Sequence, residues 1–270
     1  MAQEKTQVAS SAPPPPEASG AEVAFGQVAQ YYDHLMRNVP YRFWLTYVQS
    51  LLDRFRLRPK RVLDLACGTG TMAFLMEEAG YEVVGADVAP AMLQRAQEKA
   101  EHRGSAARFV LQDASCLSFR DEFDAAISLF DSLNYVRGED RLCAVFRGVR
   151  QALRSGGLFV FDINTLRALR LNLFSQEHFT PRDWLHYRWV SHWDEEEQLC
   201  TIDMEFWVKK SQGAEEHFRE THYQTAYPLH QIEKMLAEAG LEPVGSFDAY
   251  RTLPPHQLST RIFLVARRPE

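Results

Sequence analysis

Two glycines and three aspartates stand at the ends of predicted strands, where a ligand can approach the backbone. The segment VLDLACGTG carries Asp64 inside an apolar run and ends in Gly68 and Gly70. Glycine permits a tight turn, and the helix expected after it offers free N–H groups and the positive end of its dipole. Asp87 and Asp113 close the next two apolar segments. A carboxylate at the first position can bind a ribose diol, and one at the second suits an exocyclic amine on a purine.

The same glycine loop admits other interpretations. Strand–helix turns favour glycine in general, and GTGTMA also fits the G-x-G-x-x-A pattern of nicotinamide-dependent enzymes. Dinucleotide loops usually begin with glycine at the strand end, whereas Ala66 and Cys67 stand there in this chain. Asp64 would also add negative charge beside a pyrophosphate. These differences favour a ligand with a cationic end, and an NAD(P)-dependent reductase remains the alternative.

Alternating strands and helices must position these residues. Nearly continuous apolar strands separated by amphipathic helices are typical of a parallel sheet that is covered on both faces. The sequence therefore predicts an α/β fold with a doubly wound, mostly parallel sheet. The expected strands are 61–66, 81–87, 107–113, 123–130 and 158–164, and the expected helices are 70–80, 89–104 and 139–157.

Other segments surround this alternating core. Helical spacing predicts two helices before it, over 23–36 and 41–55, and three alternating segments after it predict an antiparallel β meander. A last helix and two strands then return to the sheet. The expected divisions are a disordered tail at 1–21, lid helices and cofactor-binding core at 22–164, a meander covering the acceptor at 165–226, and the last helix with the closing strands at 227–270.

Composition excludes several classes of partner. The net charge of −6 argues against nucleic acid, because binding phosphates requires a basic surface. No apolar run reaches the roughly 18 residues of a membrane span, and the N-terminal region lacks the apolar core of a signal peptide. The four cysteines fit no zinc spacing and indicate reduced side chains. We therefore expect a cytoplasmic protein with no membrane partner and no metal.

As a set, the motifs resemble those of class I S-adenosylmethionine-dependent methyltransferases. They are VLDLACGTG, GADVAPAML, FVLQDA, FDAAISLFDSLNY and the ending AGLEPV…RIFLVARR. The resemblance implies a Rossmann-like sheet of seven strands, whose last strand runs against the others, and S-adenosyl-L-methionine as cofactor. It also implies which residues contact the cofactor. Asp64, Ala66, Cys67, Gly68 and Gly70 would contact the methionine part, and Asp87 would contact the ribose. Val88 and Met92 would flank the adenine, Asp113 and Ala114 would contact its amine, and Phe130 would lie at the methyl group.

The region before the core also resembles a lid helix of these enzymes. Its Tyr-Asp pair would place a tyrosine near the cofactor carboxylate, with Tyr32 preferred over Tyr31. Tyr41 and Trp44 are expected as further walls of the site.

The acceptor is expected between the sheet edge, the lid and the meander. Asn134 and Tyr135 follow the fourth strand, and His222 shares a strand face with Glu220 in the meander. We regard Asn134, Tyr135 and His222 as the candidate catalytic residues. The predicted reaction is in-line methyl transfer to a nitrogen, or an oxygen, of a small molecule. A non-catalytic binding module, with the meander as a homodimer or partner surface, is the remaining alternative.

Overall fold

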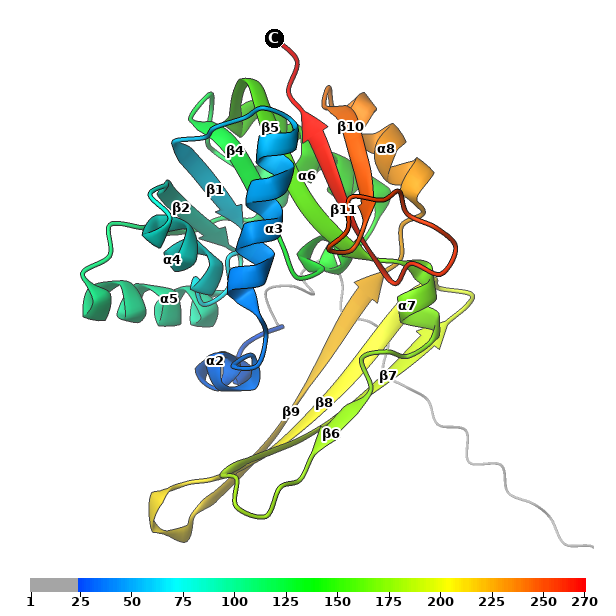
Figure 1. Cartoon of the computed structure of the whole chain (residues 1–270). Coiled ribbons are helices and arrows are strands. Elements are labelled where there is room, and N and C mark those ends of the chain that lie inside the picture. Colours follow the sequence, from blue (N-terminus) through cyan, green and yellow to red (C-terminus); the bar gives the residue numbers. More distant parts are fainter. Residues whose placement is uncertain (1–23) are drawn as a thin grey trace, which may run out of the picture.

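A seven-stranded sheet forms the centre of the computed structural model, which describes residues 24–270 (Figure 1). The strand order is β10-β11-β5-β4-β1-β2-β3, and only β11 runs against its neighbours. This confirms the predicted fold class, whereas the tail expected at 1–21 lies outside the described residues. The strands are β1 (Arg61–Leu65), β2 (Glu82–Asp87), β3 (Arg108–Leu111), β4 (Phe123–Ser128), β5 (Leu153–Asn164), β10 (Glu242–Asp248) and β11 (Arg261–Arg267).

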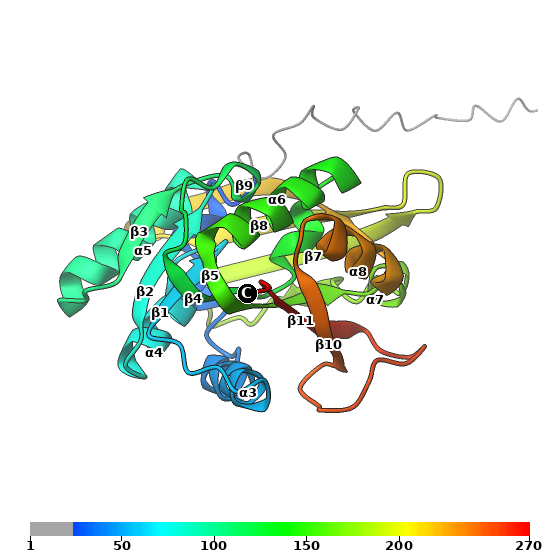
Figure 2. The same ribbon diagram turned by 90° about the horizontal axis from the view of Figure 1, so that it is seen from above.

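Helices cover both faces of this sheet (Figure 2). Successive residues of a strand point to opposite faces, so Val62 packs with α3 (Tyr41–Arg54) and α4 (Thr71–Glu78). Its neighbour Leu63 packs on the other side, in the core formed with α6 (Glu139–Ala152) and α8 (Leu229–Glu238). The remaining crossover helix, α5 (Pro90–Arg103), has its first-turn proline at N1 as expected. No helix within residues 24–270 combines the length and apolarity that crossing a membrane requires.

A second, antiparallel sheet lies beyond the carboxyl ends of the parallel strands, at the bottom of Figure 1. It contains β6 (Gln176–His178), β7 (Leu185–Asp194), β8 (Leu199–Lys209) and β9 (Glu215–Thr225). The three long strands are those that the alternating pattern predicts. The short strand β6 and the helix α7 (Leu166–Arg170) were not expected, because each has too few residues to show a period.

The helix expected over 23–36 is wrong. Val23 lies outside the described residues, and the chain that follows forms turns, a 3₁₀ helix η1 (Val28–Gln30) and a single helical turn α2 (Tyr32–Leu35). Phe25 has a left-handed φ of 65°. The N–H groups of Phe25 and Val28 donate to the carboxylate of Glu220 instead of to a preceding helical turn. A tertiary hydrogen-bond acceptor therefore replaces the helical pattern.

The helix expected over 139–157 ends early, at Ala152. Leu153 begins β5, lies beside Phe123 of β4 and is fully buried. Gly156 then adopts a left-handed φ of 76°. β5 therefore begins inside the range in which the helical spacing continues. For this reason, periodicity alone does not place the boundary between α6 and β5.

The glycine loop connects β1 to α4 through three left-handed residues, Ala66, Gly68 and Gly70. A Cβ on Gly70 would lie 2.8 Å from Cε1 of Phe109 and 3.2 Å from Cε2 of Phe74. A Cβ on Gly68 would meet nothing within 4 Å. The two glycines thus differ: Gly70 is needed for packing beneath the loop, whereas Gly68 leaves open space above it.

This difference predicts unequal costs for two otherwise similar substitutions. Both Gly68→Ala and Gly70→Ala incur the left-handed strain of about 1–2 kcal/mol, but Gly70→Ala also overpacks the Phe74–Phe109 contact, at about 1–3 kcal/mol. Urea unfolding of the two variants should therefore give a lower free energy of unfolding for Gly70→Ala. Equal destabilisation would contradict the packing role of Gly70.

Candidate active site

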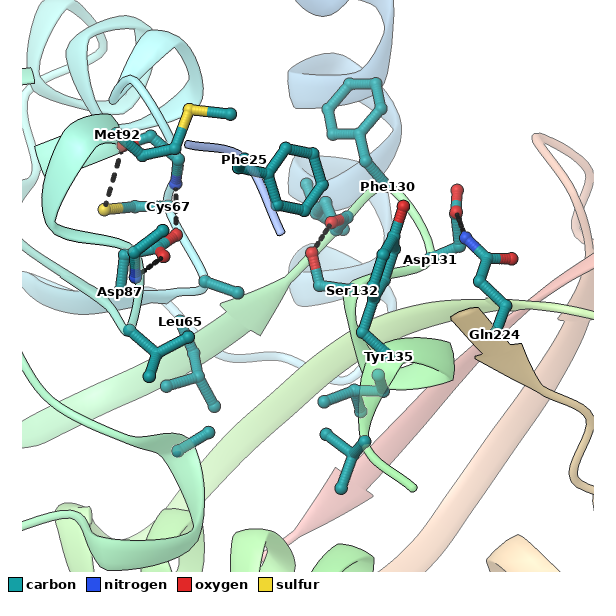
Figure 3. A pocket seen from close by; sticks show the side chains of 18 of the residues that line it. Phe25, Leu65, Cys67, Asp87, Met92, Phe130, Asp131, Ser132, Tyr135 and Gln224 are labelled. Carbon is teal, nitrogen blue, oxygen red and sulfur yellow. Dashed lines mark hydrogen bonds between the residues drawn. The ribbon is translucent and has the colours of Figure 1, made fainter. Parts of the chain in front are cut away.

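A cavity of about 1420 Å³ lies between the carboxyl edge of the large sheet, the segment 25–44 and the small sheet. In Figure 3, Asp87 and Met92 lie on one side of it and Asp131, Tyr135 and Gln224 on the other. Two regions far apart in sequence thus contribute to one hollow. The predicted site residues that line it are Tyr32, Asp64, Ala66, Cys67, Gly68, Asp87, Val88, Met92, Asp113, Ala114, Phe130 and Tyr135.

Two buried carboxylates stand side by side where β1 and β2 end. Asp64 is 3% exposed, and its Oδ2 is buried with no hydrogen-bond partner among residues 24–270. Burial and the nearby charge of Asp87 raise the pKa of Asp64 to about 8. Asp87 is held by the N–H groups of Ala89 and Gly68, at 2.8 and 2.7 Å, yet burial still raises its pKa. A pair of buried carboxylates is stabilised when a cation or the hydrogen-bond donors of a ligand contact it.

The third predicted carboxylate, Asp113, is held by its own chain. Its Oδ1 accepts from the N–H and the hydroxyl of Ser115, at 2.8 and 2.7 Å, and caps the 3₁₀ helix η2 (Ala114–Cys116). Its Oδ2 accepts from Arg141 at 2.6 Å. Burial opposes ionisation, but these hydrogen bonds and the guanidinium charge lower its pKa. Asp113 is therefore ionised and fixed in orientation at the cavity wall.

Aromatic rings form the wall between the two sides of the cavity. Phe130 stacks on Trp44 with ring centroids 4.0 Å apart, and Tyr41 lies 4.8 Å from Phe130. Tyr32 also lines this region, and burial raises its pKa well above the usual value. Phe130 and Asp131 both have left-handed φ angles, of 63° and 53°, directly after β4. Consecutive strained residues of this kind are characteristic of functional sites.

The lid segment is attached to the glycine loop by polar contacts. Asp33 accepts from the hydroxyl of Thr69 at 2.6 Å and from Nζ of Lys99 at 2.8 Å. Tyr32, the residue before Asp33, lines the cavity, whereas Tyr31 packs against Phe218 of the small sheet and does not line it.

Polar residues that the sequence did not identify form the far side of the cavity. Asp131 accepts from Arg261 at 2.6 Å and from Gln224 at 2.6 Å, and Arg261 also contacts the buried Asp162. The Asp162 pKa is raised to about 6, because burial outweighs the effect of Arg261. Asp131 directly follows the predicted fourth strand, and an aspartate at a strand end could have been identified as a site residue. Gln224 and Arg261 carry no local pattern that marks them.

Three predicted site residues do not line the cavity: Gly70, Asn134 and His222. Asn134 is fully buried; its amide donates to the carbonyls of Asn164 and Thr225, and its Oδ1 accepts from the Asn164 N–H. Through these bonds the Asn134 amide joins β5 to the small sheet. We therefore correct the expectation that Asn134 contacts an acceptor, because its amide has a structural role. Gly70 lies beneath the loop.

His222 lies behind Tyr135, one layer away from the cavity. Its Nδ1 is 3.1 Å from the Tyr135 hydroxyl, and its Nε2 is 3.1 Å from Oε2 of Glu220. Glu220 and His222 thus face the same side of β9, as the alternation predicts. His186 and His192 of β7 do not line the cavity.

Similarity to known proteins agrees with this geometry. A family described as "Methyltransferase domain" matches residues 62–157. A Geobacillus sp. (strain WCH70) protein named "Putative methyltransferase" is 30% identical over 248 residues, which cover 91% of this chain and all of that protein.

Solved structures share the fold over nearly the whole chain. An S-adenosylmethionine-dependent methyltransferase from Clostridium acetobutylicum ATCC 824 is 28% identical, covers 90% of this chain and 98% of its own, and has a TM-score of 0.79. A sugar N-methyltransferase from Streptoalloteichus sp. ATCC 53650, 21% identical, covers 100% and 99% with a TM-score of 0.76. The unpaired Oδ2 of Asp64 and the open loop above Gly68 suit a cofactor with a cationic end. The chain therefore belongs to the class I S-adenosylmethionine-dependent methyltransferases, and its cofactor is S-adenosylmethionine.

Proposed function

We propose that the protein transfers the methyl group of S-adenosylmethionine to a nitrogen, or less readily an oxygen, of a small molecule. One observation carries this proposal. A single cavity holds both Asp64, whose Oδ2 has no partner among the described residues, and the polar group around Asp131, and aromatic rings lie between the two. One side suits a zwitterionic donor and the other a polar acceptor. A short in-line path between them supplies much of the acceleration in methyl transfer.

The donor side is proposed to hold the cofactor through the carboxylate pair and the loop. Asp64 would pair with the ammonium of the methionine part, and the loop of Ala66, Cys67 and Gly68 would lie along it. Each carboxylate oxygen of Asp87 already accepts one backbone N–H and keeps a lone pair that a ribose hydroxyl can use. Val88 and Met92 would flank the adenine, with Asp113 and Ala114 near its amine. Phe130 and Tyr32 would face the sulfonium, whose positive charge aromatic rings stabilise.

The acceptor side combines an acidic floor with an apolar wall. Asp131 and Asp162 carry two carboxylates against the one guanidinium of Arg261. This excess of acid supports an acceptor that carries an amine. Tyr187 and Trp189 of the small sheet add ring surfaces to the wall, which suits a ring-shaped or apolar body. In this proposal, residues 22–164 and 227–270 bind the cofactor, and 165–226 cover the acceptor.

A likeness to one neighbour supports nitrogen as the accepting atom. The Streptoalloteichus protein described above is a sugar N-methyltransferase, and its fold matches this chain from end to end. At 21% identity that likeness concerns the fold, so the acidic floor of this chain is the stronger support. Together they favour small amines, including amino sugars, as the first acceptors to test.

Isotope transfer tests the proposed reaction directly. The protein, S-adenosylmethionine with a CD₃ methyl group and a bacterial metabolite extract should yield a small molecule that gains CD₃ on nitrogen, as detected by mass spectrometry. Asp87→Ala should abolish the product, because losing hydrogen bonds of about 1.5–3 kcal/mol each to the ribose weakens cofactor binding by at least about 100-fold. Asp53→Ala, an exposed position on α3, should leave the yield unchanged. No labelled product from wild-type protein that binds the cofactor would contradict the proposal.

The raised pKa of Asp64 predicts a pH-dependent stability without cofactor. Its pKa lies near 8 in the folded chain and near 3.8 in the unfolded chain. The folded state thus holds a proton that the unfolded state releases, and the resulting stability is full below about pH 4 and is lost as the pH rises to 8. Asp64→Asn keeps a neutral side chain at every pH. The free energy of unfolding of Asp64→Asn minus that of wild type should therefore increase by about 2–4 kcal/mol as the pH rises from 4.5 to 8. A constant difference in urea unfolding across this range would refute the buried, protonated state.

A further inference from the structure

A buried chain of three side chains leads from the cavity into the small sheet. The Tyr135 hydroxyl lines the cavity, His222 lies behind it with its side chain fully buried, and Glu220 lies behind His222 with its side chain 9% exposed. Both links are 3.1 Å long. The proposed donor and acceptor contacts leave His222 and Glu220 without a role, although burying a histidine and a glutamate has a cost that a function would justify.

The partners of Glu220 determine which way the hydrogen bonds run. Its Oε2 accepts from the N–H of Phe25 at 3.0 Å and its Oε1 from the N–H of Val28 at 2.9 Å. Burial opposes ionisation of Glu220, but the bonds from His222 and from these two amides prevail and lower its pKa. An ionised carboxylate can only accept hydrogen bonds, so Nε2 of His222 must carry a proton.

The tautomer of a neutral His222 follows from this. With the proton on Nε2, Nδ1 has a free lone pair and accepts from the Tyr135 hydroxyl. Gln224 uses one lone pair of the Tyr135 oxygen, and the other remains for a group in the cavity. Burial, followed by the charge of Asp131, raises the pKa of Tyr135 above its usual value. Tyr135 is therefore a neutral hydroxyl that can accept a proton on its oxygen only while passing its own proton to His222.

We propose that Tyr135, His222 and Glu220 form a proton relay that takes the proton released by the acceptor during methyl transfer. This inference rests on the proposed function. The lone pair of the acceptor nitrogen or oxygen forms the bond to the methyl carbon, and the carbon–sulfur bond breaks with its electrons left on sulfur. The N–H or O–H proton of the acceptor moves to the Tyr135 oxygen as the Tyr135 proton moves to Nδ1. The resulting imidazolium is paired with the Glu220 carboxylate.

The three residues have different roles in this relay. Tyr135 touches the acceptor and is the catalytic residue, whereas His222 and Glu220 act through it. Glu220 is a positioning residue, because it fixes the tautomer of His222 and stabilises the imidazolium. It also accepts a hydrogen bond from the backbone N–H of Phe25. The Phe25 ring lies 4.5 Å from the ring of His222 and lines the cavity, so it separates His222, but not Tyr135, from the cavity. The relay is thus complete only when the segment 25–28 is docked.

The imidazole tautomer provides a test that needs no acceptor. In the full-length protein labelled with ¹⁵N-histidine, long-range ¹H–¹⁵N spectra with S-adenosylhomocysteine bound, recorded over a range of pH, should show that the neutral form of His222 carries its proton on Nε2 and none on Nδ1. Tyr135→Phe should shift the Nδ1 resonance, because that nitrogen loses its donor. Tyr223→Phe, the next residue along β9 and absent from the cavity lining, should leave it in place. Protonation on Nδ1 instead of Nε2 would overturn the relay.

Turnover provides the second arm. With labelled cofactor at saturation and a fixed dilution of the metabolite extract, Tyr135→Phe should release S-adenosylhomocysteine at least about 100-fold more slowly, the usual size of a general acid–base contribution. Glu220→Gln should also slow it, while the exposed control Glu215→Gln should not. The affinity for S-adenosylhomocysteine should stay within twofold in Tyr135→Phe, which shows that the variant is folded.

The outcomes separate the relay from the proposed function. If wild type releases labelled product and Tyr135→Phe does so within twofold of its rate, the relay is overturned and methyl transfer stands. If wild type binds S-adenosylhomocysteine but transfers no methyl group to any component of the extract, the proposed function fails, and the relay fails with it. A slow Tyr135→Phe together with the Nε2 tautomer supports both.

Discussion

Two buried carboxylates, Asp64 and Asp87, are the constraint around which this site is organised. β1 and β2 are neighbouring parallel strands whose register sets Asp64 opposite Gly85, two residues before Asp87, and the charge of Asp87 acts on Asp64. Burial favours the neutral form of each, and one oxygen of Asp64 has no partner in the described part of the chain. A protein gains nothing in stability from such a pair. In the proposed function, the ammonium and the ribose diol of S-adenosylmethionine would donate to these two carboxylates.

The rest of the cavity follows from where the chain goes after each strand. Two left-handed residues follow the end of β4, where Phe130 stacks on Trp44 and Asp131 pairs with Arg261. The small sheet then closes the space from below, as Figure 1 shows, and brings Gln224 to Asp131. The far side of the cavity thus draws on both sheets: Asp131 and Arg261 come from the large sheet and the loop after β4, whereas Gln224 comes from β9 of the small sheet.

The sequence predicted the parts of the site that depend on local pattern. Gly68 and Asp87 stand at strand ends that apolar runs make visible, and the membership of the family excludes the reductase alternative. What failed depended on tertiary partners. The lid helix was lost because Glu220, nearly two hundred residues away, takes the N–H groups of Phe25 and Val28. Asn134 was misread because its amide joins β5 to the small sheet, a contact that no spacing in the chain reveals.

The proton balance of cofactor binding tests the central claim most directly. At pH 7 the free protein carries Asp64 mainly protonated, since its pKa lies near 8. An ammonium placed beside it favours the carboxylate, so binding of S-adenosylmethionine should release between about 0.5 and 1 proton, as measured by calorimetry in buffers of different ionisation enthalpy. Asp64→Asn should remove this release. Tight binding with no proton released by the wild-type protein would contradict the account.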